Sequence, residues 1–168
     1  VKSQCEVLVS DVYSGYNKAI RVANELRLST KLPNIVPAHC NAHARRGFFK
    51  MWPKYKEAEF YLDHYHEIYQ LNSKAKAQAP PIILELRAQM RQHFEAMKQR
   101  ALEELASYSL RGKYAQALKY FIKNYNTLTY FLTDAEFPID NNAQVRNLRS
   151  HVVGRKTWYG THSKRGAL

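Results

Sequence analysis

Two short apolar segments near the start of the chain have the composition of buried β-strands. Residues 5–11 (CEVLVSD) are rich in β-forming side chains and end in a polar turn, and residues 34–40 (NIVPAHC) form a second such segment. The stretch between them predicts a helix from about Asn17 to Leu28. The predicted apolar side of this helix consists of Ala19, Ile20, Ala23 and Leu26. Two strands with a helix between them predict a βαβ unit.

After Cys40 the apolar positions follow a helical period for about 100 residues. Steps of three or four residues place the members of a first stripe on one helix face: Leu86, Met90, Phe94, Met97, Ala101 and Leu105. A second stripe has the same spacing: Tyr114, Leu118, Phe121, Tyr125, Leu128 and Leu132. Gly112 separates the two, Pro80 and Pro81 begin the first helix, and the polar residues 71–79 predict a loop before it. We interpret both stripes as core, packed as an antiparallel helix pair.

Length and composition limit the class of protein. A chain of 168 residues suits one ordinary domain, and its apolar fraction of 45% excludes wholesale disorder. No apolar run approaches the ~20 residues that span a bilayer, and Glu6 and Asp11 lie where a secretory signal would be uncharged. Cys5 and Cys40 are too few for a disulfide framework. We therefore expect a cytoplasmic protein without a membrane partner.

The charge of the chain favours a polyanionic partner. With 26 Lys and Arg against 14 Asp and Glu, the net charge is +12, a balance that by itself leaves DNA, RNA and anionic membranes open. No acidic residue follows Asp140, whereas six basic residues do: Arg146, Arg149, Arg155, Lys156, Lys164 and Arg165. A helix capped by Asp140 or Asn141 would present Arg146 and Arg149 on one face to successive phosphates, and Trp158 adds a stacking surface. The alternative is a basic tail that only increases solubility.

Candidate chemistry near the predicted strands centres on Asp11. It ends the first strand, where open α/β sheets bind ligands, so it is either a metal ligand or a turn residue. His39, Cys40 and His43 raise the possibility of zinc, but a structural zinc site needs four N or S ligands and no second pair stands nearby. His43, followed by Arg45 and Arg46, points instead to a phosphate or a neighbouring carboxylate.

Four segments resemble, in the same order, the central catalytic domain of transposases of the insertion-sequence-66 family. They are residues 10–17 (SDVYSGYN), 38–49 (AHCNAHARRGFF), 112–132 (GKYAQALKYFIKNYNTLTYFL) and 139–161 (IDNNAQVRNLRSHVVGRKTWYGT). The resemblance implies a ribonuclease-H-like fold of the DDE type, in which two Asp and one Glu hold two Mg²⁺ or Mn²⁺ ions that cut and rejoin DNA. For this chain it implies an α/β, mostly α, partial fold that keeps few strands and carries a large helical insertion.

The resemblance also assigns the site residues. The family's second Asp corresponds to Asp11, and its first Asp lies on strands that would precede Val1. The family's Glu corresponds to Val145, which offers no oxygen to Mg²⁺, and Asp140 lies about 140° away around a helix. We expect the DNA-binding residues to be His43, Arg45, Arg46, Asn141, Asn142, Arg146, Arg149, Arg155, Lys156, Trp158, Lys164 and Arg165.

The sequence therefore predicts an N-terminally truncated, catalytically incomplete part of a bacterial DDE transposase. Its expected partners are transposon ends and target DNA, which would bring it to the nucleoid. We divide it into a strand and helix part (1–53), a helical insertion (54–132) and a C-terminal helix with a basic segment (133–168). A non-enzymatic DNA-binding remnant and a helical protein without a specific partner are the alternatives. An open edge on the first strand would favour self-association.

Overall fold

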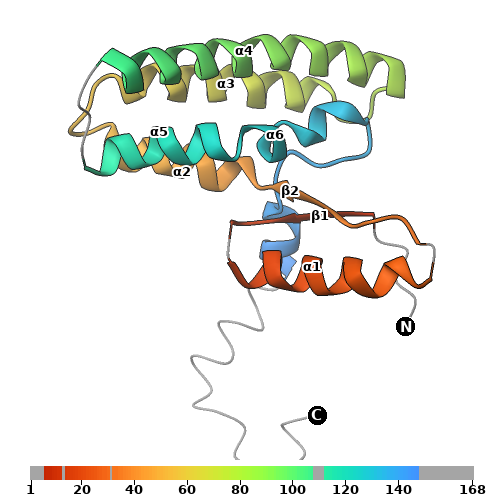
Figure 1. Ribbon diagram of the computed structural model, residues 1–168. Helices are drawn as coiled ribbons and strands as arrows, with labels where there is room; N and C mark the ends of the chain where they lie inside the picture. Colours follow the sequence, from red (N-terminus) through yellow and green to blue (C-terminus); the bar gives the residue numbers. More distant parts are fainter. Residues whose placement is uncertain (1–5, 13, 31, 108–111, 148–168) are drawn as a thin grey trace, which may run out of the picture.

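A computed structural model describes residues 6–12, 14–30, 32–107 and 112–147 of the chain. The elements follow in the order β1 (Val7–Ser10), α1 (Ser14–Leu28), β2 (Val36–His39), α2 (Asn41–Met51), α3 (Ala58–Lys74), α4 (Pro80–Ser107), α5 (Lys113–Lys123), α6 (Tyr125–Leu128) and the 3₁₀ helix η1 (Tyr130–Thr133). Residues 142–147 are again helical. Figure 1 shows α3 and α4 in one layer, α2 and α5 in the next, and the strands with α1 at one end.

The predicted βαβ unit is confirmed. β1 and β2 pair in parallel, from Val7 opposite Val36 to Ser10 opposite His39, and α1 connects them. Among the described residues these two strands make up the whole sheet. The described part is thus α/β and mostly helical, as the sequence predicts. None of its helices is long and apolar enough to cross a membrane.

The apolar side predicted for α1 is partly wrong. Ile20 is buried, but Leu26 is 68% exposed. The buried side includes polar residues, because Asn24 both donates to the carbonyl of Ile35 (3.1 Å) and accepts from its N–H (2.7 Å). Arg27 in turn donates to the carbonyl of Pro33 at 2.7 Å. Hydrogen bonds to the segment that leads into β2, and not apolar periodicity alone, therefore orient this helix. α1 also begins at Ser14, earlier than predicted.

Both apolar stripes form the core, as predicted. Four members of the first stripe on α4 are fully buried: Met90, Phe94, Met97 and Ala101. All six members of the second stripe are buried as well. α4 and α5 pack on each other and run antiparallel (Figure 1), and α4 also packs along α3. Phe48 of α2 stacks on Tyr61 of α3, with ring centroids 4.3 Å apart, so all four helices share one core.

Two predicted boundaries in the helical part are wrong. The second stripe does not lie on one helix, because α5 ends at Lys123 and the stripe continues over α6 and η1. The break occurs where Asn124 donates its side-chain amide to the carbonyl of Tyr120 at 2.8 Å, in competition with regular helical bonding. The predicted loop at 71–79 is also too long, since α3 continues to Lys74 and buries part of Leu71 against the core.

Candidate functional site

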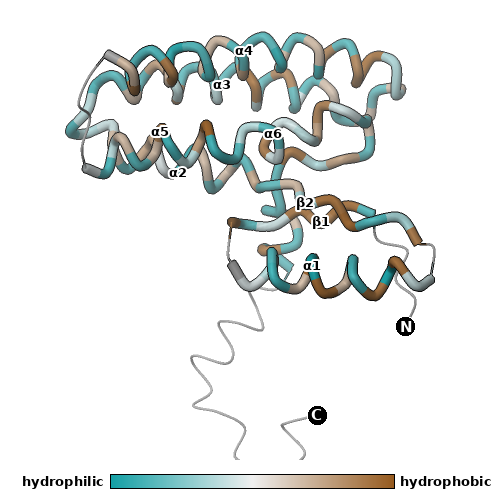
Figure 2. Tube along the Cα trace, viewed as in Figure 1, coloured by the Kyte–Doolittle hydropathy of each residue, from teal (hydrophilic) through white to brown (hydrophobic). Residues whose placement is uncertain are grey.

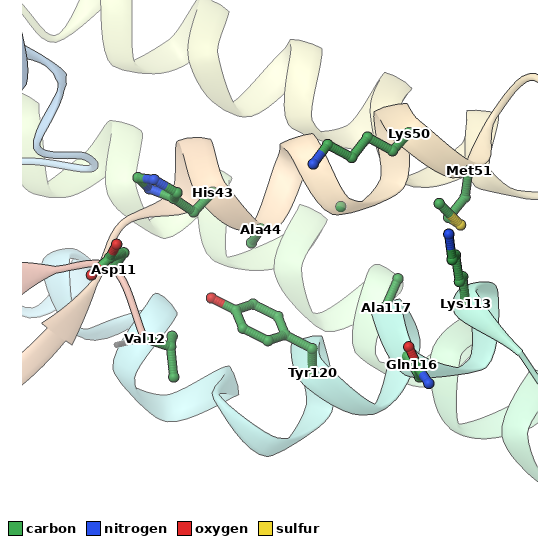
Figure 3. Close-up of a pocket in the computed structure, with 11 residues that line it drawn as sticks. Asp11, Val12, His43, Ala44, Lys50, Met51, Lys113, Gln116, Ala117 and Tyr120 are labelled. Carbon is green, nitrogen blue, oxygen red and sulfur yellow. The ribbon is translucent and has the colours of Figure 1, made fainter. Parts of the chain in front are cut away.

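Asp11 lies directly after β1 and lines a cavity of about 570 Å³. The opposite walls come from α2 and α5, which pack on each other beyond the end of the strand. Asp11 is the one carboxylate among the lining residues, and three of the others are basic: His43, Lys50 and Lys113. Figure 3 shows Asp11 and His43 toward one end of this Asp11 cavity and Lys113 toward the other. The cavity therefore combines one acid with a basic wall.

Two buried polar atoms in the Asp11 cavity have no partner within the described ranges. They are Oδ1 of Asp11 and Nδ1 of His43. Because buried polar groups in folded proteins are nearly always hydrogen-bonded, these atoms are the ones that a ligand or water would satisfy. His39 does not share this role, since its Nδ1 pairs with the hydroxyl of Thr127 at 2.7 Å.

Burial favours the neutral forms of two side chains near Asp11, His39 and Tyr120. Burial lowers the pKa of His39, although the charge of Asp11 acts in the opposite direction. Burial also raises the pKa of Tyr120 to about 12, and the charge of Asp11 adds to the effect. The Tyr120 hydroxyl on the cavity wall therefore remains a hydrogen-bond donor at neutral pH.

The described residues do not fit a divalent metal ion. No group of three or more His, Cys, Asp or Glu side chains comes together anywhere in them. In the Asp11 cavity a single carboxylate faces cationic side chains, whereas Mg²⁺ takes an octahedral shell of oxygen ligands. His39, Cys40 and His43 form no such group among the described residues, and Nδ1 of His39 pairs with the hydroxyl of Thr127.

The C-terminal helical turn is capped as predicted, by Asp140. Its Oδ1 accepts the N–H of Asn142 at 3.0 Å, and its Oδ2 accepts both the side-chain amide of Asn142 (2.9 Å) and the hydroxyl of Tyr69 (3.0 Å). This carboxylate is therefore committed to structure. Val145, which we predicted from the resemblance to occupy the family's Glu position, is 47% exposed and does not line the Asp11 cavity.

A second cavity, of about 470 Å³, brings together three of the predicted DNA-binding residues. Arg45 and Arg46 of α2 meet Asn142 there, although nearly a hundred positions separate the two segments along the chain. The remaining lining residues are Ala42, Phe49, His66 and Tyr69. Sequence reasoning missed the last three of these. The spacing of residues 42, 45, 46 and 49, which is that of one helix face, could have pointed to Phe49.

Asn41 explains why these distant segments meet. Its side-chain amide donates to the carbonyls of Leu128 (2.9 Å) and Ile139 (3.2 Å), and its Oδ1 accepts the hydroxyl of Tyr65 at 3.3 Å. The fully buried Asn41 thus joins the start of α2 to α3, α6 and the irregular segment before Asp140. Sequence reasoning did not single out this residue.

The other predicted DNA contacts divide into two groups. Arg146 lines a neighbouring cavity together with Asn142, and Oδ1 of Asn141 is buried without a partner among the described residues. The rest lie outside the described residues: Arg149, Arg155, Lys156, Trp158, Lys164 and Arg165.

Comparison with known protein families matches residues 3–168 to the Transposase IS66 family. The chain belongs to this family. The match covers all four segments that carry the resemblance in the sequence. Family members of the DDE type use divalent metals in general, although the described residues form no such site.

One relative of this transposase-family chain is an uncharacterized protein, y4hP, of Sinorhizobium fredii (strain NBRC 101917 / NGR234). The two are 28% identical over 176 residues, which is 96% of this chain and 31% of the relative. The chain therefore spans about a third of the length of this relative. No solved structure matches it significantly.

Proposed function

We propose that this chain is the part of a DDE transposase that contributes the second Asp, as Asp11, together with a DNA-facing basic surface. In this proposal β1, α1 and β2 belong to a ribonuclease-H-like fold, and residues 54–132 are its helical insertion. The observation that carries the proposal is the buried, unpartnered carboxylate oxygen of Asp11 at the carboxyl end of β1, within the described residues. Ligands of open α/β sheets bind at this end of the strands.

The same site supports the proposal that the chain does not complete the catalytic centre by itself. Two-metal cleavage of a phosphodiester requires several oxygen ligands around two cations. Asp11 is the one carboxylate that lines its cavity, and Val145 carries a hydrocarbon side chain. This chain alone therefore supplies at most one of the family's three acidic ligands.

The basic wall of the Asp11 cavity supports a role in holding DNA. Lys50 on α2 and Lys113 at the start of α5 are exposed, and both line the cavity. Their charges attract a phosphate backbone and offset its repulsion from Asp11. The residues of this chain would then position a strand beside Asp11, while the metal chemistry requires further ligands.

Catalytic incompleteness is tested with the purified chain and a supercoiled plasmid in Mg²⁺ or Mn²⁺. We expect neither nicking nor strand transfer, and Val145→Glu alone should not restore either, because one carboxylate is still missing. Metal-dependent nicking that disappears in Asp11→Asn would contradict this part of the proposal.

The proposed DNA-binding surface also includes Arg45 and Arg46, two exposed arginines of α2, and DNA binding is tested there. The double substitution Arg45→Ala/Arg46→Ala removes two phosphate contacts and should weaken duplex binding. The slope of the logarithm of the binding constant against the logarithm of the salt concentration should become shallower by up to about 1.8. Arg91→Ala/Lys123→Ala removes the same charge from exposed positions on α4 and α5 and is the matched control. If the two double variants lost the same amount of DNA affinity, net charge alone would explain the effect. The proposed surface would then be wrong.

A further inference from the structure

We propose that the cavity between α2, α3 and Asn142 holds one unpaired nucleotide of a DNA strand. This Phe49 cavity is lined by Arg45, Arg46, Phe49, His66, Tyr69 and Asn142, with Ala42 at its edge. The inference rests on the proposed function, since it assumes that the chain binds DNA. It adds the structural state of the DNA that is bound and the residues that bind it.

Phe49 provides the stacking surface. It lies outside the α2 face that carries the core residues Ala44 and Phe48, and its side chain is 55% exposed. A single exposed aromatic residue is common on protein surfaces, but here the ring lines a concave site next to two arginines. Aromatic side chains in basic grooves stack on bases of single strands, because every base presents a π-face.

Asn142 provides a hydrogen-bond acceptor with a fixed orientation. Its side-chain NH₂ donates to Oδ2 of Asp140 at 2.9 Å, and its backbone N–H is held by the other oxygen of the same carboxylate. The side chain therefore offers its Oδ1 to a ligand. All four bases have an N–H donor on the Watson–Crick edge, and that edge is free only when the base is unpaired.

Two arginines make the rest of the Phe49 cavity basic, and hydrogen bonds to Asp140 fix two of its wall residues. Arg45 and Arg46 are adjacent, exposed residues of α2. Their guanidinium groups can bind a phosphate of the DNA backbone. The nearby acid, Asp140, accepts three hydrogen bonds, one of them from Tyr69 of the cavity wall. Its charge is thus used to fix Tyr69 and Asn142, and the arginines remain to attract phosphate.

The shape of the cavity favours an unpaired nucleotide over a duplex. Its volume of about 470 Å³ falls within the roughly 300–1,000 Å³ of sites that enclose small ligands. In a duplex the faces of the bases are covered by their neighbours, so a ring inside a cavity can reach only a base that has left the stack. A free end or a distorted junction provides such a base.

The test compares labelled oligo-dT of about ten nucleotides with a duplex of equal length, by fluorescence anisotropy at one salt concentration. Phe49→Ala should weaken oligo-dT binding roughly 5- to 150-fold, as expected for the loss of one stacked base, and leave duplex binding unchanged. Phe49→Trp should preserve it. Leu84→Ala, which truncates an exposed apolar side chain on α4, is the control and should change neither affinity.

Three results would overturn the inference. They are oligo-dT affinity that Phe49→Ala leaves unchanged, an equal loss of oligo-dT and duplex binding, and tighter binding of oligo-rU than of oligo-dT. In each case duplex binding that still depends on Arg45 and Arg46 would leave the proposed function standing. If the unaltered chain bound neither oligo-dT nor duplex DNA, the proposed function itself would be contradicted. Circular dichroism of each variant distinguishes these results from misfolding.

Discussion

At the scale of single residues, one buried amide organises both candidate cavities. Asn41 begins α2, the helix that contributes His43 and Lys50 to one cavity and Arg45 and Arg46 to the other. Its three side-chain hydrogen bonds are made to groups that are far away in the sequence. A buried polar residue of this kind stabilises the fold only while all of its partners are present.

Asn41→Ala should therefore lower the free energy of unfolding by about 3 kcal/mol, at roughly 1 kcal/mol for each hydrogen bond lost. Urea denaturation followed by circular dichroism measures this change. Asn126→Ala, at an exposed position of α6, should cost less than about 0.5 kcal/mol and serves as the control. A similar small effect at both positions would show that Asn41 does not join the two segments.

At the scale of elements, α3 and α4 are joined by a pair of histidines as well as by the core. Nδ1 of His64 and Nδ1 of His93 lie 2.9 Å apart, a hydrogen bond that requires at least one neutral ring. Burial lowers the pKa of His64 below its usual 6.5, and the charge of His93 lowers it further, while Asp63 and Glu67 oppose the shift. The helix pair is thus sensitive to acid.

The sign of this dependence follows from the lowered pKa. Above the unfolded-state pKa of about 6.5 both states bind the same number of protons at His64, and its contribution to stability is complete. As the pH falls below that value the unfolded chain binds a proton first, so stability is lost progressively through the lower, folded-state pKa. Burial lowers the pKa of His39 too, which acts in the same direction.

We therefore predict that the urea midpoint falls between about pH 7.5 and about pH 5.5, and that it falls less in His64→Gln. His66→Gln, on the exposed side of the same helix, should leave the pH dependence as it is. Parallel pH curves for the unaltered chain and His64→Gln would exclude the histidine pair as the source.

At the scale of the whole molecule, the βαβ end is much less covered than the helical layers. β1 pairs with β2 alone among the described residues, and α1 exposes Val22 (43%), Leu26 (68%) and Leu28 (76%). Figure 2 shows hydrophobic stretches along α1 next to those of β1 and β2. Exposed apolar side chains gathered on one helix favour association with another chain.

The chain should accordingly self-associate as its concentration rises, and Val22→Glu/Leu26→Glu should shift it toward the monomer. Size-exclusion chromatography with light scattering measures this. Ile82→Glu/Leu84→Glu, which alters two exposed apolar positions on α4, is the comparison and should have a smaller effect. A monomer at every concentration tested would contradict the prediction.

The amino-acid sequence by itself determined the local features of this protein. The two short strands, the helical stripes, the start of α4 at Pro80 and the cap at Asp140 depend on residues within a few positions of one another. Periodicity and capping preferences act at that range, and they predicted these features correctly. The family, too, followed from four motifs read in order.

The tertiary structure alone decided which of these features meet. Asn41 bonds to the carbonyl of Ile139 across 98 positions, and this contact brings Asn142 to Arg45 and Arg46. The buried face of α1 was mispredicted for the same reason, because Asn24 faces the segment before β2 through hydrogen bonds that apolar periodicity does not record. Long-range contacts depend on the path of the whole chain, so no local pattern of residues specifies them.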